Sequence, residues 1–245
     1  MHPKRQHFIL LAIALVGCVS NQKESMVKAE ATGSYPDVKV VGAMKNVMWK
    51  GELGGSILLD TISPKSGLYG LGPESYLTGE LLINDGNTFV SRVTSDSTMA
   101  VEKYADVTAP FFVFAHVTEW KTVELPANVV TMAELEKYID EQTVSLKRPF
   151  AFKLIGTVKR ATIHVQNLPV GATVSSPAEA HQGQVNYPLN NEKATIIGFF
   201  STEHQAVFTH HDSFMHLHLI TTDERKMGHL DELEIDNMTL YLPVK

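Results

Sequence analysis

The sequence has one cysteine, no excess of positive charge and no long apolar run, and each of these absences excludes a class of protein. A single cysteine among 245 residues cannot close an internal disulfide, so a disulfide-stapled scaffold is excluded. The net charge of −6 gives no electrostatic basis for phosphate binding, which argues against a nucleic-acid partner. A chain of this length can bury a sizeable core, and we find no internal repeat in it.

The first residues have the layout of an export signal. Positive charge at Lys4 and Arg5 precedes an apolar run over 8–16, which is too short to span a bilayer. Small residues then lead into Cys18, and this arrangement resembles the lipobox of bacterial lipoproteins, in which the cysteine is lipidated and becomes the new N-terminus. The alternative interpretations are a plain signal peptide that contains a cysteine and a buried core segment.

Three regions follow from this interpretation. We expect residues 1–17 to be a lipoprotein signal peptide, residues 18–36 to be a flexible tether, and residues 37–245 to form the folded domain. The protein would then be exported and lipid-anchored to a bacterial membrane, on its periplasmic or cell-surface side. Only the lipid would contact the membrane.

The folded region is predicted to be α+β with β predominant. Asp85-Gly86 lies between two apolar runs and predicts a tight hairpin. Thr131 and Glu134 form a capping box in front of an amphipathic helix over about 132–142. The stretch 168–177 predicts an exposed loop. A mostly antiparallel β half is predicted by five runs rich in β-branched and aromatic residues, at 150–158, 161–165, 195–200, 214–221 and 232–242.

Histidines are concentrated near the C-terminus. Six of them lie within 26 residues, at positions 204, 210, 211, 216, 218 and 229. His216 and His218 lie in an apolar run that reads as a strand, so both imidazoles would project from one face. The polar stretch 221–228 can turn the chain and return His229 beside them. Three neutral imidazoles with an open fourth position are typical of a catalytic zinc site.

Other interpretations of this cluster stay open at this point. A His-X-His pair can lie on a solvated strand face, and cupins and carbonic anhydrases also carry such strands, so the pair does not name a reaction. His210 and His211 are adjacent and would point to opposite faces of a strand, so at most one of them could join the same site. We interpret both, with His204, as loop residues.

Longer segments resemble one family, the α-acetolactate decarboxylases. Four segments of this chain, taken together, resemble the C-terminal zinc motif of that family: GFF at 198–200, MHLHLI at 215–220, DER at 223–225 and GH at 228–229. Upstream, YGLGPESYLTGELLI at 69–83 resembles the family's Gly-Leu-Gly…Gly-Glu segment. Pro110-Phe111 and the predicted strand 152–156 follow in the family's order. The resemblance spans about 41–242.

The resemblance implies a fold, a site and a reaction. The fold would be an N-terminal mixed β-sheet with helices, followed by a C-terminal antiparallel β-barrel-like half that carries the zinc site. Zn²⁺ would be held by His216, His218 and His229, Glu80 would be the catalytic carboxyl group, and Leu77 would line the substrate pocket. The reaction would be decarboxylation of the small oxo acid 2-acetolactate to acetoin. Family members are usually dimers, so a homodimer is a candidate assembly.

The chain also departs from the family pattern. The family has two arginines in the strand after the helix, and here Lys153 and His164 stand at those positions. His164 is therefore the candidate for orienting the substrate, and Arg160 lies too far along the strand to replace the missing group. Three functions fit: a decarboxylase with rearranged substrate contacts, a zinc lyase or isomerase for a related oxo acid, and a surface lipoprotein that binds zinc or a related 2-hydroxy-3-oxo acid without turnover.

Overall fold

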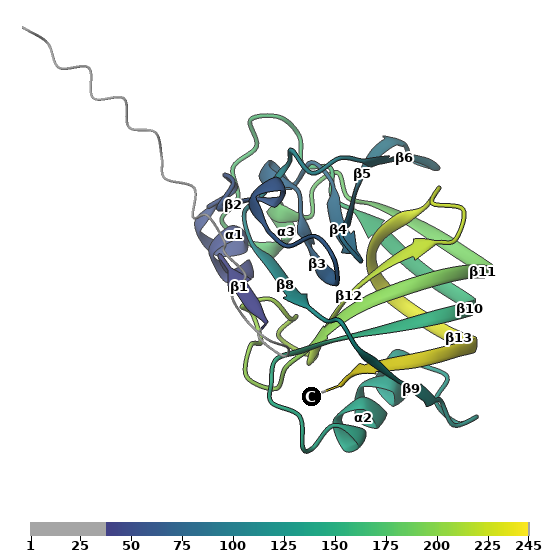
Figure 1. Ribbon diagram of the computed structural model, residues 1–245. Coiled ribbons are helices and arrows are strands. Elements are labelled where there is room, and N and C mark those ends of the chain that lie inside the picture. The colour runs from purple at the N-terminus through teal and green to yellow at the C-terminus, as the bar shows by residue number, and fades with distance from the viewer. Residues whose placement is uncertain (1–37, 245) are drawn as a thin grey trace, which may run out of the picture.

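The computed structural model describes residues 38–244 and is dominated by strands (Figure 1). The predicted signal peptide, the tether over 18–36 and the lipidation candidate Cys18 lie outside the described residues. None of the helices within 38–244 is both long and apolar enough to cross a membrane.

The N-terminal half is a sheet of six strands. Their order across the sheet is β1 (Lys39–Val41), β8 (Phe112–His116), β3 (Leu68–Pro73), β4 (Glu80–Asn84), β5 (Asn87–Ser95) and β6 (Thr98–Lys103). Neighbouring strands are antiparallel throughout, a more uniform pairing than the mixed sheet that the resemblance implied. Asp85 and Gly86 join β4 to β5 with φ angles of 47° and 79°, which confirms the predicted hairpin.

Short elements surround this sheet. They are α1 (Met44–Lys50), the pair β2 (Ile57–Leu58) and β7 (Thr108–Ala109), and two 3₁₀ turns at Leu59–Thr61 and Ser75–Leu77. The second 3₁₀ turn ends shortly before β4 begins, so Leu77 is close to Glu80 along the chain.

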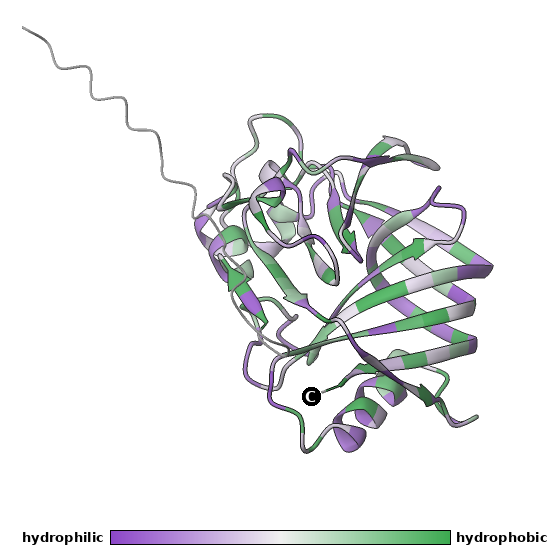
Figure 2. Cartoon of the chain, in the orientation of Figure 1, coloured by the Kyte–Doolittle hydropathy of each residue, from purple (hydrophilic) through white to green (hydrophobic). Residues whose placement is uncertain are grey.

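The C-terminal half is a strongly curved antiparallel sheet. Its strands are β10 (Phe150–Val165), β11 (Val185–Phe200), β12 (Met215–Thr221), β13 (Met227–Pro243) and β9 (Trp120–Glu124). β10 pairs with β13 as well as with β11, so the pairing that runs from β10 through β11 and β12 to β13 returns to β10. Apolar and polar residues alternate along these strands (Figure 2), as expected for a sheet with one buried face.

The two runs predicted at 150–158 and 161–165 form one continuous strand. The intervening Lys159 and Arg160 lie on the exposed face and both pair with Glu234 of β13, so polarity there does not end the strand. Bulges between β10 and β13 bend the pair around the core. At Gly156, φ is 155° and a Cβ atom would overlap the carbonyl oxygen of Asn237, so the close approach of β13 requires glycine.

Helix α2 (Met132–Gln142) has the predicted bounds and the predicted capping box. Its buried residues Leu135 and Ile139 pack on the C-terminal core. The predicted loop 168–177 is only partly exposed, because Leu168 and Val174 pack with α1 and Leu77 before the short helix α3 (Pro177–Ala180) begins.

One apolar cluster joins the two halves. It contains Tyr69 from β3, Val113 from β8, Ala151 from β10 and Phe199 from β11, all of them buried. Because the two sheets share these contacts, residues 38–244 pack as one domain.

Candidate metal centre between the two halves

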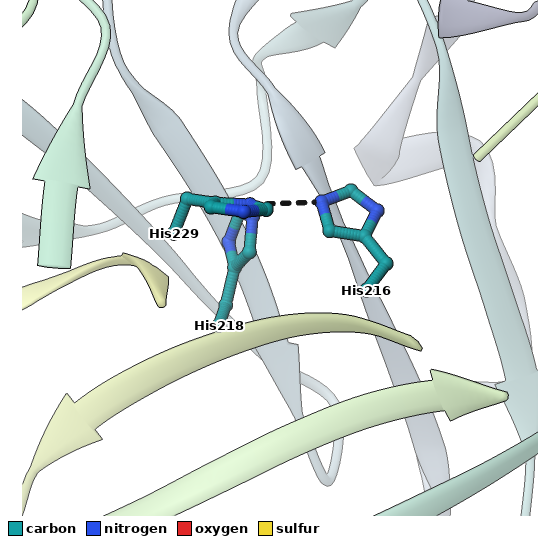
Figure 3. Close-up of side chains that lie close together, drawn as sticks. All are labelled: His216, His218 and His229. Atoms are coloured by element: carbon teal, nitrogen blue, oxygen red, sulfur yellow. Dashed lines mark hydrogen bonds between the residues drawn. The ribbon is translucent and has the colours of Figure 1, made fainter. Parts of the chain in front are cut away.

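Three histidines converge on the inner face of the curved sheet (Figure 3). His216 and His218 project from the same face of β12, and His229 of β13 is paired directly with His218. His216 Nε2 lies 3.1 Å from His229 Nδ1, and one ring nitrogen from each of the three lies within 4.8 Å of the others. The predicted hairpin and the predicted common face are therefore confirmed.

A glycine allows this arrangement. Gly228 precedes His229, and a Cβ atom at Gly228 would overlap the carbonyl oxygen of His164 on β10. β13 can therefore approach β10 closely here, and His229 pairs with His164 on one side and with His218 on the other.

The environment keeps the three imidazoles neutral. Burial, with the nearby His164 as a second cause, lowers the pKa of His218 to about 3. Burial also holds the pKa values of His216 and His229 well below the ordinary value, and the neighbouring histidines add to this effect. Neutral imidazoles offer the lone pairs that a metal ion binds.

One unpaired nitrogen tests whether the residues fit a metal. His218 is fully buried, yet its Nε2 atom has no hydrogen-bond partner among the described residues. A buried polar atom without a partner costs free energy, and such atoms are rare in folded proteins. A metal ion at the meeting point of the three rings would satisfy this nitrogen, so the donor set fits.

Glu80 lies beside this centre at the start of β4. It is 3% exposed, its Oε2 lies 3.6 Å from His218 Nε2, and its Oε1 lies 3.9 Å from His164 Nε2. Burial raises the pKa of Glu80 well above its ordinary value, a backbone hydrogen bond from Gln166 opposes the rise, and the charge of Asp231 adds to it. The carboxyl group therefore keeps its proton to a higher pH than an exposed glutamate does.

His164 also faces the centre, from β10. Its Nδ1 lies 2.8 and 2.9 Å from the two carboxylate oxygens of Asp231, so Nδ1–H donates to Asp231 and Nε2 is directed toward Glu80. Arg160 is exposed and pairs with Glu234, so it does not share the buried face of His164 and does not replace the missing group. Lys153 packs against the Trp120 ring, 4.6 Å from its centroid.

A narrow pocket leads to the centre. Its lining includes the predicted residues Leu77, Glu80 and His164, and its other members are Met44, Met48, Pro73, Phe111, Gln166, His181, His210, His216 and His229. No lysine or arginine lines it. Pro73 forms part of the pocket wall.

Sequence reasoning missed two residues of this site. His210 lies in a loop as predicted, but its Nε2 is 3.2 Å from His229 Nε2, while the adjacent His211 is exposed. Asp231 follows His229 by two residues on β13, and the period of two along a strand could have placed it on the same face. His204 contacts Ser201 instead, at 2.8 Å.

The fold and the histidine centre define a β-rich protein with a buried group that could hold a metal ion. The family model for alpha-acetolactate decarboxylase matches residues 41–244. The chain therefore belongs to the alpha-acetolactate decarboxylase family.

Individual relatives agree with this assignment. The alpha-acetolactate decarboxylase of Brevibacillus brevis is 29% identical over 222 residues, covering 85% of this chain and 74% of the relative. That of Bacillus subtilis strain 168 is 28% identical over 185 residues, covering 74% and 69%. A crystal structure of the alpha-acetolactate decarboxylase from this B. subtilis strain superposes with a TM-score of 0.71 at 25% identity, covering 85% of this chain and 86% of that one.

Proposed function

We propose that this chain decarboxylates 2-acetolactate to acetoin, with a zinc ion held by His216, His218 and His229. The observation that carries the proposal is the convergence of three buried, neutral imidazoles beside a buried carboxyl group with a raised pKa. Membership of the family supports decarboxylation of acetolactate as the reaction. Three protein ligands leave a coordination position open for substrate, as catalytic zinc sites do.

The residues around the centre have separate roles in this reaction. Zinc bound there would act as a Lewis acid toward the substrate's hydroxyl and carbonyl oxygens, and so favour loss of carbon dioxide. The bond between the carboxyl carbon and C2 breaks, and its electron pair stays on the substrate until a proton arrives. Glu80 holds and delivers that proton. His164, fixed by Asp231, directs Nε2 toward the substrate and toward Glu80.

Apolar side chains in the pocket wall keep water away from the centre. Leu77 and Phe111 are buried, at 1% and 3% exposure, and pack beside Met44. Together they exclude water from the centre, which strengthens the electrostatic interactions within it.

Metal content and product formation test the proposal together. The soluble protein from residue 19 onward should bind zinc and form acetoin from racemic 2-acetolactate faster than the spontaneous reaction. The variant His216→Ala should lose this zinc and the activity. Zinc binding without acetoin would refute the decarboxylase function while keeping the ligand assignment. Full zinc retention in a folded His216→Ala variant would refute the ligand assignment.

Glu80→Gln tests the proton-transfer role. The change keeps the shape of the side chain but removes the transferable proton, so zinc should remain while kcat falls by about a hundredfold or more. Glu74→Gln is the matched control, because Glu74 is also a buried glutamate but pairs with Arg92 and does not line the pocket. A Glu80→Gln enzyme with unchanged kcat would remove Glu80 from the mechanism.

We further propose that the protein is exported and lipid-anchored through Cys18 and assembles as a homodimer. Support comes from the charge, length and cysteine position of the first eighteen residues and, for the dimer, from the family resemblance. Labelling with a radioactive fatty acid in a bacterial host should mark the wild-type chain and not Cys18→Ser. Equal labelling of both would contradict the anchor, and a monomeric mass by light scattering would contradict the dimer.

A further inference from the structure

Gln166 lies in the wall of the narrow pocket, and the proposed reaction gives its side chain no role. The residue directly follows β10 and lies two positions after His164, which also lines the pocket. Two backbone hydrogen bonds hold this stretch: the N–H of Gln166 donates to Glu80, and the N–H of Leu168 donates to the carbonyl oxygen of Leu77 at 2.8 Å. The Gln166 side chain therefore projects from a backbone that is tied to two other pocket residues.

Burial leaves this side chain with an unpaired oxygen atom. Gln166 is 4% exposed, and its Oε1 has no hydrogen-bond partner among residues 38–244. An unpaired buried acceptor costs free energy, and an apolar side chain at this position would avoid that cost. Because the side chain lines the pocket, a molecule bound there can supply the missing donor.

The chemistry of the carboxamide indicates which molecule this is. An amide carries an acceptor oxygen and N–H donors side by side in one plane. A 2-hydroxy acid presents the complementary pair on neighbouring carbons, a hydroxyl group that donates and a carboxylate that accepts. The terminal bond of a glutamine side chain has two broad orientations, so the amide can present its two groups in either order.

The other polar side chains of the lining do not offer this pair. In the part of the chain that the structure describes, no lysine or arginine lines the pocket. Neutral His164 donates its Nδ1–H to Asp231, which leaves an acceptor at Nε2. A neutral His181 carries one donor and one acceptor, but its two nitrogens point in different directions and cannot both face neighbouring groups of one molecule. Glu80 is needed for the proton that replaces carbon dioxide.

We propose that the carboxamide of Gln166 binds the substrate directly, with Nε2–H donating to the carboxylate and Oε1 accepting from the 2-hydroxyl group. The pocket then selects 2-hydroxy acids over acids of the same shape that lack the hydroxyl group. The inference rests on the proposed function, because it concerns the same pocket, and it makes Gln166 a specificity-determining residue there.

The competing arrangement gives a role only to the backbone N–H of Gln166, which holds Glu80. Gln166→Met separates the two, since methionine keeps an unbranched side chain and the backbone N–H but removes both amide groups. The variant should lower kcat/KM for 2-acetolactate by about tenfold to a hundredfold, as expected for a lost hydrogen bond to a charged group. Its free energy of unfolding in urea should not fall, because the unpaired oxygen has no bond to lose in the free protein.

Binding of two stable acids tests the specificity without turnover. Zinc-loaded protein from residue 19 onward is titrated by calorimetry with 2-hydroxy-2-methylpropanoate and with 2-methylpropanoate, the same acid without the hydroxyl group. The wild type should bind the hydroxy acid more tightly, and Gln166→Met should reduce this preference by about fivefold or more. The variant keeps the three histidines, so any preference that the metal supplies remains, and the reduction measures the amide.

Gln184→Met is the matched control. The Oε1 atom of Gln184 is also buried without a partner, but this glutamine does not line the narrow pocket, so the variant should keep the wild-type preference and kcat/KM. Circular dichroism checks that each variant is folded, and Gln166→Leu provides a second apolar replacement.

The outcomes separate this inference from the proposed function. A wild type without preference for the hydroxy acid would overturn the inference, as would a preference or a kcat/KM that Gln166→Met and Gln166→Leu leave unchanged. A preference that depends on Gln166 in a protein that forms no acetoin would support the inference and refute the decarboxylase function.

Discussion

Burial of the histidine centre makes the metal-free protein sensitive to acid, and His218 is the residue whose contribution can be calculated. Its pKa is about 3 in the folded protein and about 6.5 in an unfolded chain. Because the folded pKa is the lower one, the unfolded chain binds more protons between these values. The stabilising contribution is complete above pH 6.5 and is lost as the pH falls.

The expected size follows from these two values. Protonation of His218 in the unfolded chain should lower the free energy of unfolding by about 2 kcal/mol between pH 7 and pH 5, and by about 5 kcal/mol once the pH is below 3. His218→Gln removes the titrating ring. Over the same interval, the free energy of unfolding of this variant should therefore fall by a smaller amount than that of the wild type, and the difference between the two decreases should be about 2 kcal/mol.

Urea unfolding of the chelator-treated protein, followed by circular dichroism at pH 7, 6 and 5, measures this difference. The slope with pH is the readout, because His218→Gln can also change stability at pH 7 through its packing. His218→Asn should give the same change in slope, since it also lacks the ring. Parallel pH curves for the wild type and both variants would refute the reasoning that burial keeps this imidazole neutral.

Two further predictions concern the scaffold. Thr131→Ala removes the side-chain half of the capping box of α2 and should lower the free energy of unfolding by about 1 kcal/mol in urea; no change would mean that the helix start is held by packing alone. Gly156→Ala would place a methyl group against the carbonyl oxygen of Asn237, so it should lower the free energy of unfolding by more than about 2 kcal/mol in the same measurement. A decrease below about 0.5 kcal/mol would show that β13 can move away from β10.

Local sequence patterns predicted the helices and turns that depend only on residues within one short segment. The helix at 132–142 depends on a cap and a period within one segment, and the hairpin at Asp85-Gly86 depends on two positive φ angles. The three histidines were predictable for the same reason, since two share a strand face and the third follows one turn later.

What the sequence did not reveal depends on contacts between distant segments. β10 continues through Lys159 and Arg160 because β13, more than seventy residues later, supplies Glu234 to both. The loop 168–177 is partly buried because α1 and Leu77 cover it. His210 reaches His229 by the path of a loop with no periodic pattern, so no spacing rule indicated it.

The pairing between β12 and β13 extends over only three residue pairs, and His218 and His229 form one of them. This is the shortest contact in the circuit of strands, so the backbone there has the fewest hydrogen bonds to resist opening. A metal ion that joins both side chains would cross-link the circuit at this point. Its removal should therefore speed amide hydrogen exchange first along Met227–His229 and the facing end of β12, before the long β10–β11 pairing opens.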